Sequence, residues 1–462
     1  MSHPPFQVDF RSRFKLVPWF VILPCALTWA LEIRADEKNE KPREEKRSVV
    51  GKCFSPQGTL LAREKAGKAW NFVDKLGSVY SRDRLVTIPG ERAVVVSKNN
   101  AARLLLVGNL PEFTSVPVLE CAVMLHDKQG VDLDITLETG RVLVTNKKDE
   151  GPVKVHVAVG EESWDLVLDS PGSEILVEAW ARWPQGMPFQ KDPKFAATPT
   201  NVALFCVLQG SASFKTGSNQ YGLTAPPGPA IFVHESDEAR EGSPRRLNAL
   251  PEALDPRNWN KPEMRRARDI AGRLEAEMMK KDIPTALTDL LNAADQTKDK
   301  DKVLAQEMLD QAVFTMGALD ELGLLIDTLG SKVGPQRIAA VSALRQFIGR
   351  EPRNDFVLYQ YLIQNKKYSE IQAEILVGLL HSFGETDLSR PETYDTLIGY
   401  LRNERLPIRE LALWHLVRVV PGKKIIFDPA GPPEEREKAV KEWKTLIPNG
   451  HLPPAPVEGQ RK

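Results

Sequence analysis

The chain is poor in the side chains that most often bind metals or carry redox chemistry. Its 462 residues include four cysteines and seven histidines, and no Cys-x-x-Cys pair occurs. The usual sequence signals of structural zinc, thioredoxin-like redox centres and c-type haem attachment are therefore missing. An excess of one charge is missing too, because 62 basic residues balance 62 acidic ones and the two signs are interspersed. Since no basic stripe is present, we expect no nucleic-acid partner.

Catalytic signatures are absent as well. The sequence contains no HExxH, GxSxG, GxGxxG or GxxxxGK[ST] motif. His126, His156 and His234 occur singly, without the His-x-His pair that a metal-dependent cupin would need. We therefore predict that the protein is not an enzyme, that it has no catalytic, cofactor-binding or metal-binding residues, and that it uses no cofactor.

What the chain does have is a basic segment followed by an apolar one near its start. Arg11, Arg13 and Lys15 precede LVPWFVILPCALTWA, an order typical of an export signal. As a helix, residues 16–33 span about 27 Å, slightly less than a hydrocarbon core of roughly 30 Å. Residues 1–35 are thus either a cleaved signal peptide or a retained signal anchor. We expect a cell-envelope protein, either with a single inner-membrane span and extracytoplasmic domains or, after cleavage, periplasmic.

A charged tether (residues 36–49) is followed by a predicted β domain (residues 50–235). Apolar side chains alternate with others from Val153 to Val159 and from Trp164 to Leu168, as in half-buried antiparallel strands. The runs 133–137 and 142–144 predict two further strands. Many short strands separated by turns favour an all-β, sandwich-like domain. Cys121 and Cys206 fall in strand-like runs, where they either form a disulfide in an oxidising compartment or remain buried thiols.

The second half of the chain changes to a helical period. A Pro-rich charged linker (236–263), a helical segment (264–330), a set of helical repeats (331–447) and a Pro-rich tail (448–462) are expected. QRIAAVSAL from Gln336, EIQAEILVGL from Glu370 and PIRELALWHL from Pro407 match one another at offsets of roughly 34 and 38 residues. Such a period is typical of stacked helical pairs that share a core. The predicted fold is multidomain: an N-terminal signal or membrane helix, an all-β domain and a C-terminal all-α repeat domain.

Two segments resemble the periplasmic domain of FecR-type proteins. They are SVYSRDRLVTIPGERAVVVSKNNAARLLL from Ser78 and LFCVLQGSASFKTGSNQYGLTAPPGPAIFV from Leu204, which share its succession of turns and Val-rich strands. The chain departs from that pattern at Asn99-Asn100, where an Asp-Gly turn is usual, and in a longer middle segment. The resemblance implies an inner-membrane transducer that contacts an outer-membrane partner and controls a sigma factor. Because residues 1–15 are too few to form a cytoplasmic domain, we expect no sigma-factor output here.

The segment LPIRELALWHLVRVV from Leu406 resembles HEAT-like or armadillo-like repeats, with Arg409 where such repeats often have an arginine. Together with the closing FDPAGPPEEREKAVKEWKTLIP, this combination is similar to envelope proteins of planctomycete-type bacteria. The resemblance implies surfaces that bind other proteins.

We therefore predict a non-enzymatic scaffold or sensing protein of the envelope, attached to the membrane by its N-terminal segment and binding a protein partner. The alternative is a carbohydrate-binding β-sandwich protein. Trp180 and Trp183 flank Arg182 beside the turn Pro184-Gln185-Gly186, and exposed indole rings at such a position can stack on a glycan. They are the only candidate ligand-contacting residues that the sequence provides.

Overall fold

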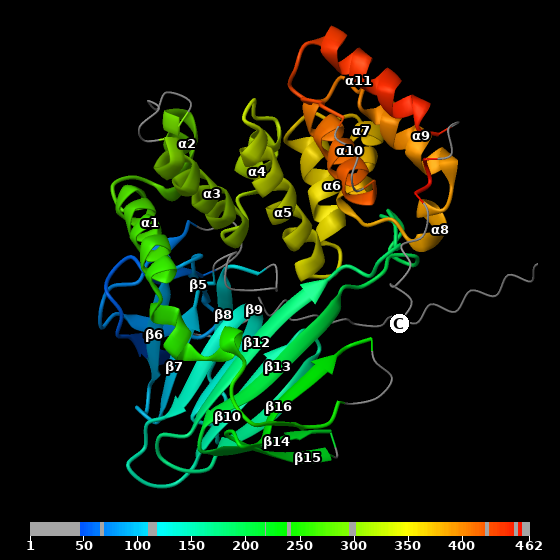
Figure 1. The fold of residues 1–462 in the computed structure, drawn as a ribbon. Coiled ribbons are helices and arrows are strands. Elements are labelled where there is room, and N and C mark those ends of the chain that lie inside the picture. The colour runs from blue at the N-terminus through cyan, green and yellow to red at the C-terminus, as the bar shows by residue number, and fades with distance from the viewer. Residues whose placement is uncertain are drawn as a thin grey trace, which may run out of the picture. The chain divides into compact units, whose positions relative to one another are not determined.

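The computed structural model describes residues 47–64, 69–109, 118–217, 219–237, 242–294, 302–420, 425–447 and 451–454, which belong to one compact unit. A β region is followed by a helical region (Figure 1), which confirms the predicted order of the two. The predicted signal or anchor (1–35) and most of the tether lie outside the described residues. Among the residues that are described, none of the helices has the length and apolar character needed to cross a membrane.

The strands form two sheets that share β9. The first sheet runs, in spatial order, through β4 (Ser78–Tyr80), β1 (Val49–Cys53), β6 (Arg92–Ser97), β7 (Ala102–Val107), β9 (Leu133–Asn146), β12 (Glu174–Arg182), β13 (Thr200–Gln209), β16 (Gly228–Glu235) and β17 (Arg245–Leu247). The second runs through β3 (Asn71–Phe72), β2 (Leu61–Arg63), β5 (Arg84–Thr87), β8 (Cys121–His126), β9, β10 (Val153–Val159), β11 (Glu162–Leu168), β14 (Ser211–Thr216) and β15 (Asn219–Thr224). Neighbouring strands are antiparallel except β9 and β10, which are parallel.

Strand β9 is one continuous strand where the sequence pattern predicted two, so that prediction was wrong. The reason is Gly140, which has φ +95° between the two apolar runs. A Cβ at this position would lie 2.6 Å from the Cα of Cys121. Only glycine adopts this backbone conformation readily and permits so close an approach, so the strand passes from one sheet to the other without ending.

The core of the β region lies between the two sheets. Side chains facing inward from both sheets form one apolar cluster, which includes the predicted rows on β10 and β11. Trp164 is 1% exposed and packs edge-on against Phe205, with ring centroids 5.1 Å apart, so its predicted place in the core is confirmed. The alternation read from the sequence thus matches the inward faces of these two strands.

The outer face of the first sheet is covered by residues that we expected to be a linker. There η2 (Glu252–Leu254) and η3 (Pro256–Asn260) follow β17, the edge strand of this sheet, and Leu254 and Trp259 pack on Leu176 and Cys206. These contacts give the segment a buried apolar side, which its Pro-rich, charged composition did not indicate.

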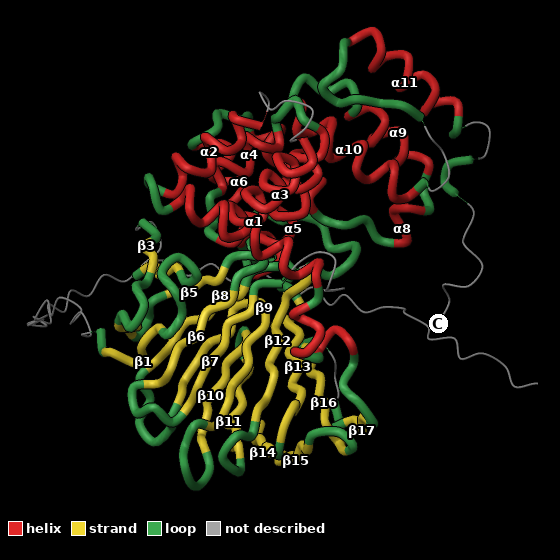
Figure 2. The backbone as a smooth tube through the Cα atoms, turned by 60° about the vertical axis from the view of Figure 1, so that its left-hand side comes forward, coloured by secondary structure: helices red, strands yellow, loops and turns green. Residues whose placement is uncertain are grey.

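The helical region begins at residue 262 and its helices stack in succession (Figure 2). They are α1 (Pro262–Met278), α2 (Ile283–Ala294), α3 (Lys302–Ala318), α4 (Leu322–Leu329), α5 (Gly334–Arg350), α6 (Asn354–Gln364), α7 (Glu370–Leu380), α8 (Glu385–Leu388), α9 (Pro391–Tyr400), α10 (Leu406–Val419) and α11 (Pro433–Thr445). The three segments that match one another in sequence lie on α5, α7 and α10, and α7 packs against both of the others.

The helices share a core with the second sheet. Leu61, Val86 and Ala122 are register partners on β2, β5 and β8, and they belong to the apolar cluster of the helical region. Their strand neighbours Leu85 and Val123 point into the sandwich instead. Because side chains alternate along a strand, the second sheet supplies one face to each core.

Candidate functional site

A hollow on the described part of the chain lies between α7 and α9. Local sequence determines where both helices begin. Ser369 Oγ accepts a hydrogen bond from the Gln372 backbone N–H at 3.2 Å, and the Gln372 side chain accepts one from the Ser369 N–H at 3.3 Å, which forms a capping box at the start of α7. Helix α9 begins with Pro391, whose missing N–H is not needed in a first turn.

The β12–β13 arm, the connection of residues 183–199 between β12 and β13, contributes Gly186 and Pro188 to the lining of this hollow. The arm leaves the sheet and lies against the helices. The Arg353 guanidinium donates to the carbonyl oxygens of Gln190 and Lys191 at 2.8 and 3.0 Å. Lys191 Nζ lies 2.9 Å from Glu374 Oε2 on α7. A segment of the β region thereby becomes part of a site in the helical region.

Close backbone packing holds the turn of the arm against α8. Gly186 has φ +79°, and a Cβ built there would lie 2.9 Å from the Cα of Gly384. Trp183 Nε1 donates to the Met187 carbonyl at 2.9 Å across the same turn. A side chain at position 186 would therefore push the arm away from the start of α8.

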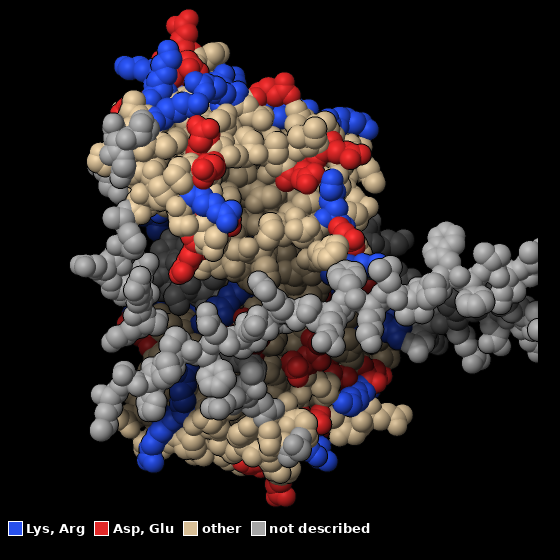
Figure 3. All heavy atoms as spheres, turned by 90° about the vertical axis from the view of Figure 1, so that its right-hand side faces the viewer, with Lys and Arg blue, Asp and Glu red and all other residues tan. Residues whose placement is uncertain are grey.

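The hollow, which we name the α7–α9 groove, has a volume of about 740 Å³. Both helices line it with residues three or four positions apart, so one face of each helix forms a wall. Gly378 on α7 leaves open space where a side chain would stand. Figure 3 shows a face of the molecule whose upper half is mostly uncharged and hollowed, with charged side chains around it. The lining residues are Gly186, Pro188, Ile371, Glu374, Ile375, Gly378, Leu379, His381, Ser382, Phe383, Asp387, Arg390, Glu392, Thr393, Thr396, Leu397 and Tyr400.

A buried polar pair lies at the inner end of the groove. His381 and Asp355 have side chains that are each 1% exposed, with Nε2 and Oδ2 3.6 Å apart. Neither ring nitrogen of His381 has a hydrogen-bond partner among the described residues, and neither has Asp355 Oδ2. Trp183 and Phe189 of the arm cover the imidazole, with ring centroids at 4.5 and 6.4 Å.

The end of α7 is held from below by α10. His415 Nε2 lies 2.6 Å from the Leu379 carbonyl, to which it donates, and burial lowers the pKa of His415 to about 4. Arg345 donates to the Leu380 carbonyl and to Ser382 Oγ, and its guanidinium lies 4.6 Å from the ring centroid of Trp414. The neutral imidazole and the guanidinium therefore hold the end of α7 through hydrogen bonds to its last carbonyl groups.

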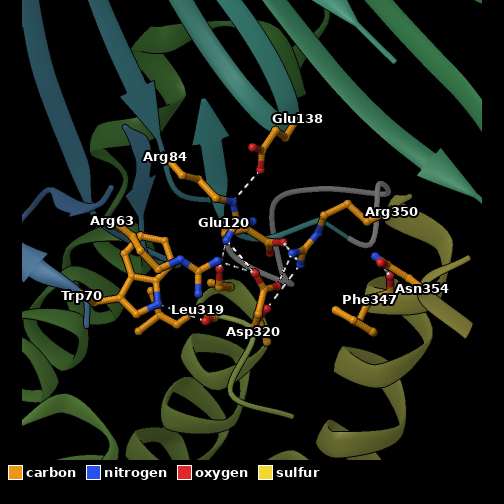
Figure 4. Close-up of polar contacts among 12 residues, drawn as sticks. Arg63, Trp70, Arg84, Glu120, Glu138, Leu319, Asp320, Phe347, Arg350 and Asn354 are labelled. Carbon is orange, nitrogen blue, oxygen red and sulfur yellow. Dashed lines mark hydrogen bonds and ion pairs between the residues drawn. The ribbon is translucent and has the colours of Figure 1, made fainter. Parts of the chain in front are cut away.

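A second polar cluster joins the β region to the helices (Figure 4), and we name it the Asp320 cluster. Asp320, in the turn between α3 and α4, is paired with Arg63 at 3.0 Å, with Arg84 at 2.8 Å and with Arg350 at 2.6 Å. Arg84 also reaches Glu138 at 2.6 Å, and Arg350 reaches Glu120 at 3.1 Å. Trp70 Nε1 donates to the Leu319 carbonyl at 3.0 Å, directly beside the cluster.

The charges of the Asp320 cluster balance one another. Burial acts to raise the pKa of Asp320, but the attraction of the Arg350, Arg84 and Arg63 guanidiniums outweighs it and lowers that pKa. For Arg350, burial opposes the charged form, yet Asp320 and Glu120 raise its pKa overall. Three guanidiniums thus face three carboxylates, which leaves no charge for a ligand. We interpret the cluster as a structural contact that holds the β region and the helices together.

The two tryptophans predicted to contact a ligand lie in different environments. Trp180 is half-buried on β12, opposite Val202 of β13. Trp183 is half-buried in the arm with its Nε1 bonded to Met187, and its ring meets the edge of His381. Trp183 is therefore adjacent to the groove, while stacking of either ring on a ligand stays a prediction.

The structure separates the histidines and cysteines named from the sequence. His126 bonds to Thr136 at 2.8 Å, His156 to Asp165 at 2.7 Å, and the ring of His234 lies 5.4 Å from that of Trp164. Within the described residues, no group of three or more His, Cys, Asp or Glu side chains is placed to hold a metal ion. Cys121 and Cys206 are free, buried thiols in different clusters, one between the sheets and one on the outer face.

No protein-family model, curated protein or solved structure matches this chain.

Sequence reasoning missed His381, Asp355 and the lining of α7 and α9. The turn Pro184-Gln185-Gly186 was visible in the sequence, but a turn motif does not indicate what the turn contacts. The only available signal was Gly378, a glycine in the interior of an otherwise helix-favouring segment, which often has a packing or functional reason.

Proposed function

We propose that this chain is a non-enzymatic protein of the cell envelope that binds a segment of a partner protein in the α7–α9 groove. The observation that carries the proposal is the groove itself. Its volume of about 740 Å³ and its largely apolar walls are suited to a ligand, and the unsatisfied His381–Asp355 pair marks its inner end. The exposed side chain of Ile371, 72% accessible, and that of Met187, 48% accessible, add apolar surface at the groove or beside it.

The same proposal includes the finer fold relationships, a FecR-like β region and HEAT-like helices. The two-sheet sandwich and the matching sequence segments on α5, α7 and α10 support them. Stacked helical pairs often present long binding surfaces to other proteins. The N-terminal segment would attach the protein to the inner membrane or direct its export.

Site-specific cross-linking in intact cells tests the proposed function. A photoreactive benzoyl-phenylalanine replaces Ile371 in the groove, and in a matched strain it replaces Ile338, which is 50% exposed on α5. We expect a reproducible protein adduct from position 371 that is absent from position 338, identified by mass spectrometry. Equal adducts from both positions, or none from position 371, would contradict groove binding.

A further inference from the structure

The charge of the α7–α9 groove indicates what kind of segment it accepts. Three acidic side chains, Glu374, Asp387 and Glu392, line the groove, against one basic side chain, Arg390. Asp387 accepts a hydrogen bond from the Gly384 N–H at 3.3 Å, which orients but does not neutralise it. Lys191 pairs with Glu374, but both side chains are about half exposed, and such pairs contribute little. The lining therefore keeps an excess of negative charge.

Asp355 adds negative charge behind the inner end. Its Oδ1 accepts the Phe356 N–H at 2.7 Å, and its Oδ2 lies 3.6 Å from Nε2 of His381 without forming a hydrogen bond among the residues that the structure describes. A buried carboxylate is screened less by water and salt than a surface one. Arg345 is the basic group next to this end, and it is already bound to Leu380 and Ser382. An acidic side chain thus stands directly behind His381, a lining residue of the groove.

The aromatic side chains of the groove suit a basic occupant as well. Phe383 and Tyr400 are half-buried in the lining. The protein itself repeatedly pairs guanidinium groups with aromatic faces in this region, as Arg405 does with Tyr368 at 4.5 Å and Arg353 with Phe356 at 4.4 Å. A lysine or arginine of the occupant can make the same kind of contact.

We propose that the segment bound in the α7–α9 groove is a basic peptide, with lysine or arginine side chains interleaved among apolar ones. Its apolar residues would contact Ile371, Ile375 and Leu397, and its cations would face Glu374 and Glu392. This inference rests on the proposed function, because it specifies the partner of the same groove.

A random dodecapeptide library displayed on phage, panned against the immobilised full-length chain, tests the inference. An Ile371→Gln chain, which removes apolar surface without adding charge, serves to identify enrichment that depends on the groove. We expect the peptides lost with Ile371→Gln to be rich in Lys and Arg together with Leu, Ile or Phe. Groove-dependent peptides that are acidic or uncharged would overturn the inference and leave the proposed function intact. If no enrichment is lost with Ile371→Gln, both are wrong.

The strongest enriched peptide, synthesised, then provides a quantitative test. Glu392→Lys should weaken its binding about tenfold, and added salt should weaken binding to the native chain. Glu434→Lys is the matched control, because Glu392 and Glu434 each follow the first-turn proline of an α-helix, α9 and α11 respectively. Equal losses from the two substitutions would show that the peptide is not held by the groove, and would overturn the inference.

Discussion

Among single residues, Arg350 has the most demanding role, because it neutralises two carboxylates where the sheet meets the helices. Its side chain is 6% exposed and that of Glu120 is 4% exposed. Arg350→Met would remove the charge while keeping much of the apolar stem. Since Glu120 and Asp320 would lose their shared partner, we expect the free energy of unfolding to fall by about 3 kcal/mol.

Urea unfolding followed by circular dichroism measures this change. Arg402→Met is the matched control, because the Arg402–Glu437 pair is 41% exposed on both sides and should contribute no more than about 1 kcal/mol. If the two substitutions lower the free energy of unfolding by similar amounts, the Asp320 cluster does not hold the β region and the helices together.

Glu275 on α1 gives a residue-level prediction about pH. Burial, and then repulsion from Glu91, raises the pKa of Glu275 to about 7. The folded protein therefore binds this proton more tightly than the unfolded chain, so stability is highest below the ordinary glutamate pKa and declines as the pH rises toward 7. Glu275→Gln should remove this decline and stabilise the protein at pH 8 by about 1 kcal/mol, a figure reduced for partial exposure. Thermal unfolding of both chains at pH 5 and pH 8 measures this difference in stability. If stability depends on pH equally in the native and Glu275→Gln chains, the prediction is wrong.

Among the elements, the β12–β13 arm supplies two lining residues of the groove, Gly186 and Pro188. Gly186→Ala should displace the arm, because the added Cβ meets the backbone of Gly384. Gly151→Ala is the matched control: Gly151 has the same φ of +79° but nothing within 4 Å of a Cβ. Both variants carry the same backbone strain, of about 1–2 kcal/mol. Only Gly186→Ala should speed hydrogen exchange in residues 183–190 and weaken peptide binding, and the same behaviour in both variants would refute the role of the arm.

The elements also show what the sequence can predict. The period of two in β10 and the proline starts of α5 and α10 are local signals, and the structure agrees with them. Other contacts join residues that are far apart in the chain, such as Gly186 with Gly384 and Arg350 with Glu120. The sequence around one of these residues does not indicate which residue it will contact. The prediction split strand β9 into the apolar runs 133–137 and 142–144, because the pattern of apolar residues does not show that the backbone continues through Gly140. The groove could not be predicted, since its walls meet only after the helices stack and the arm docks.

At the scale of the whole molecule, the sheet and the helices should unfold together. Gln311 of α3 donates to the Pro89 carbonyl, and the row Leu61, Val86 and Ala122 is buried under the helices. We expect peptides from β5 and α3 to exchange amide hydrogens with equal opening free energies, because neither can open without exposing the other. Helix α11, which packs on α9 at the end of the stack, should exchange more readily. Hydrogen exchange followed by mass spectrometry measures the opening free energies of β5, α3 and α11. Unequal opening free energies for β5 and α3 would contradict a shared core.

Strand β9 has a consequence for how the sandwich assembles. Its first half is hydrogen-bonded to β8 and β10 and its second half to β7 and β12, on one unbroken backbone. A slip of one residue would turn the inward face of a strand outward, and on β9 it would do so in both sheets at once. A pairing error in one sheet therefore cannot stay local, and tension applied to one sheet is transmitted along the peptide chain to the other.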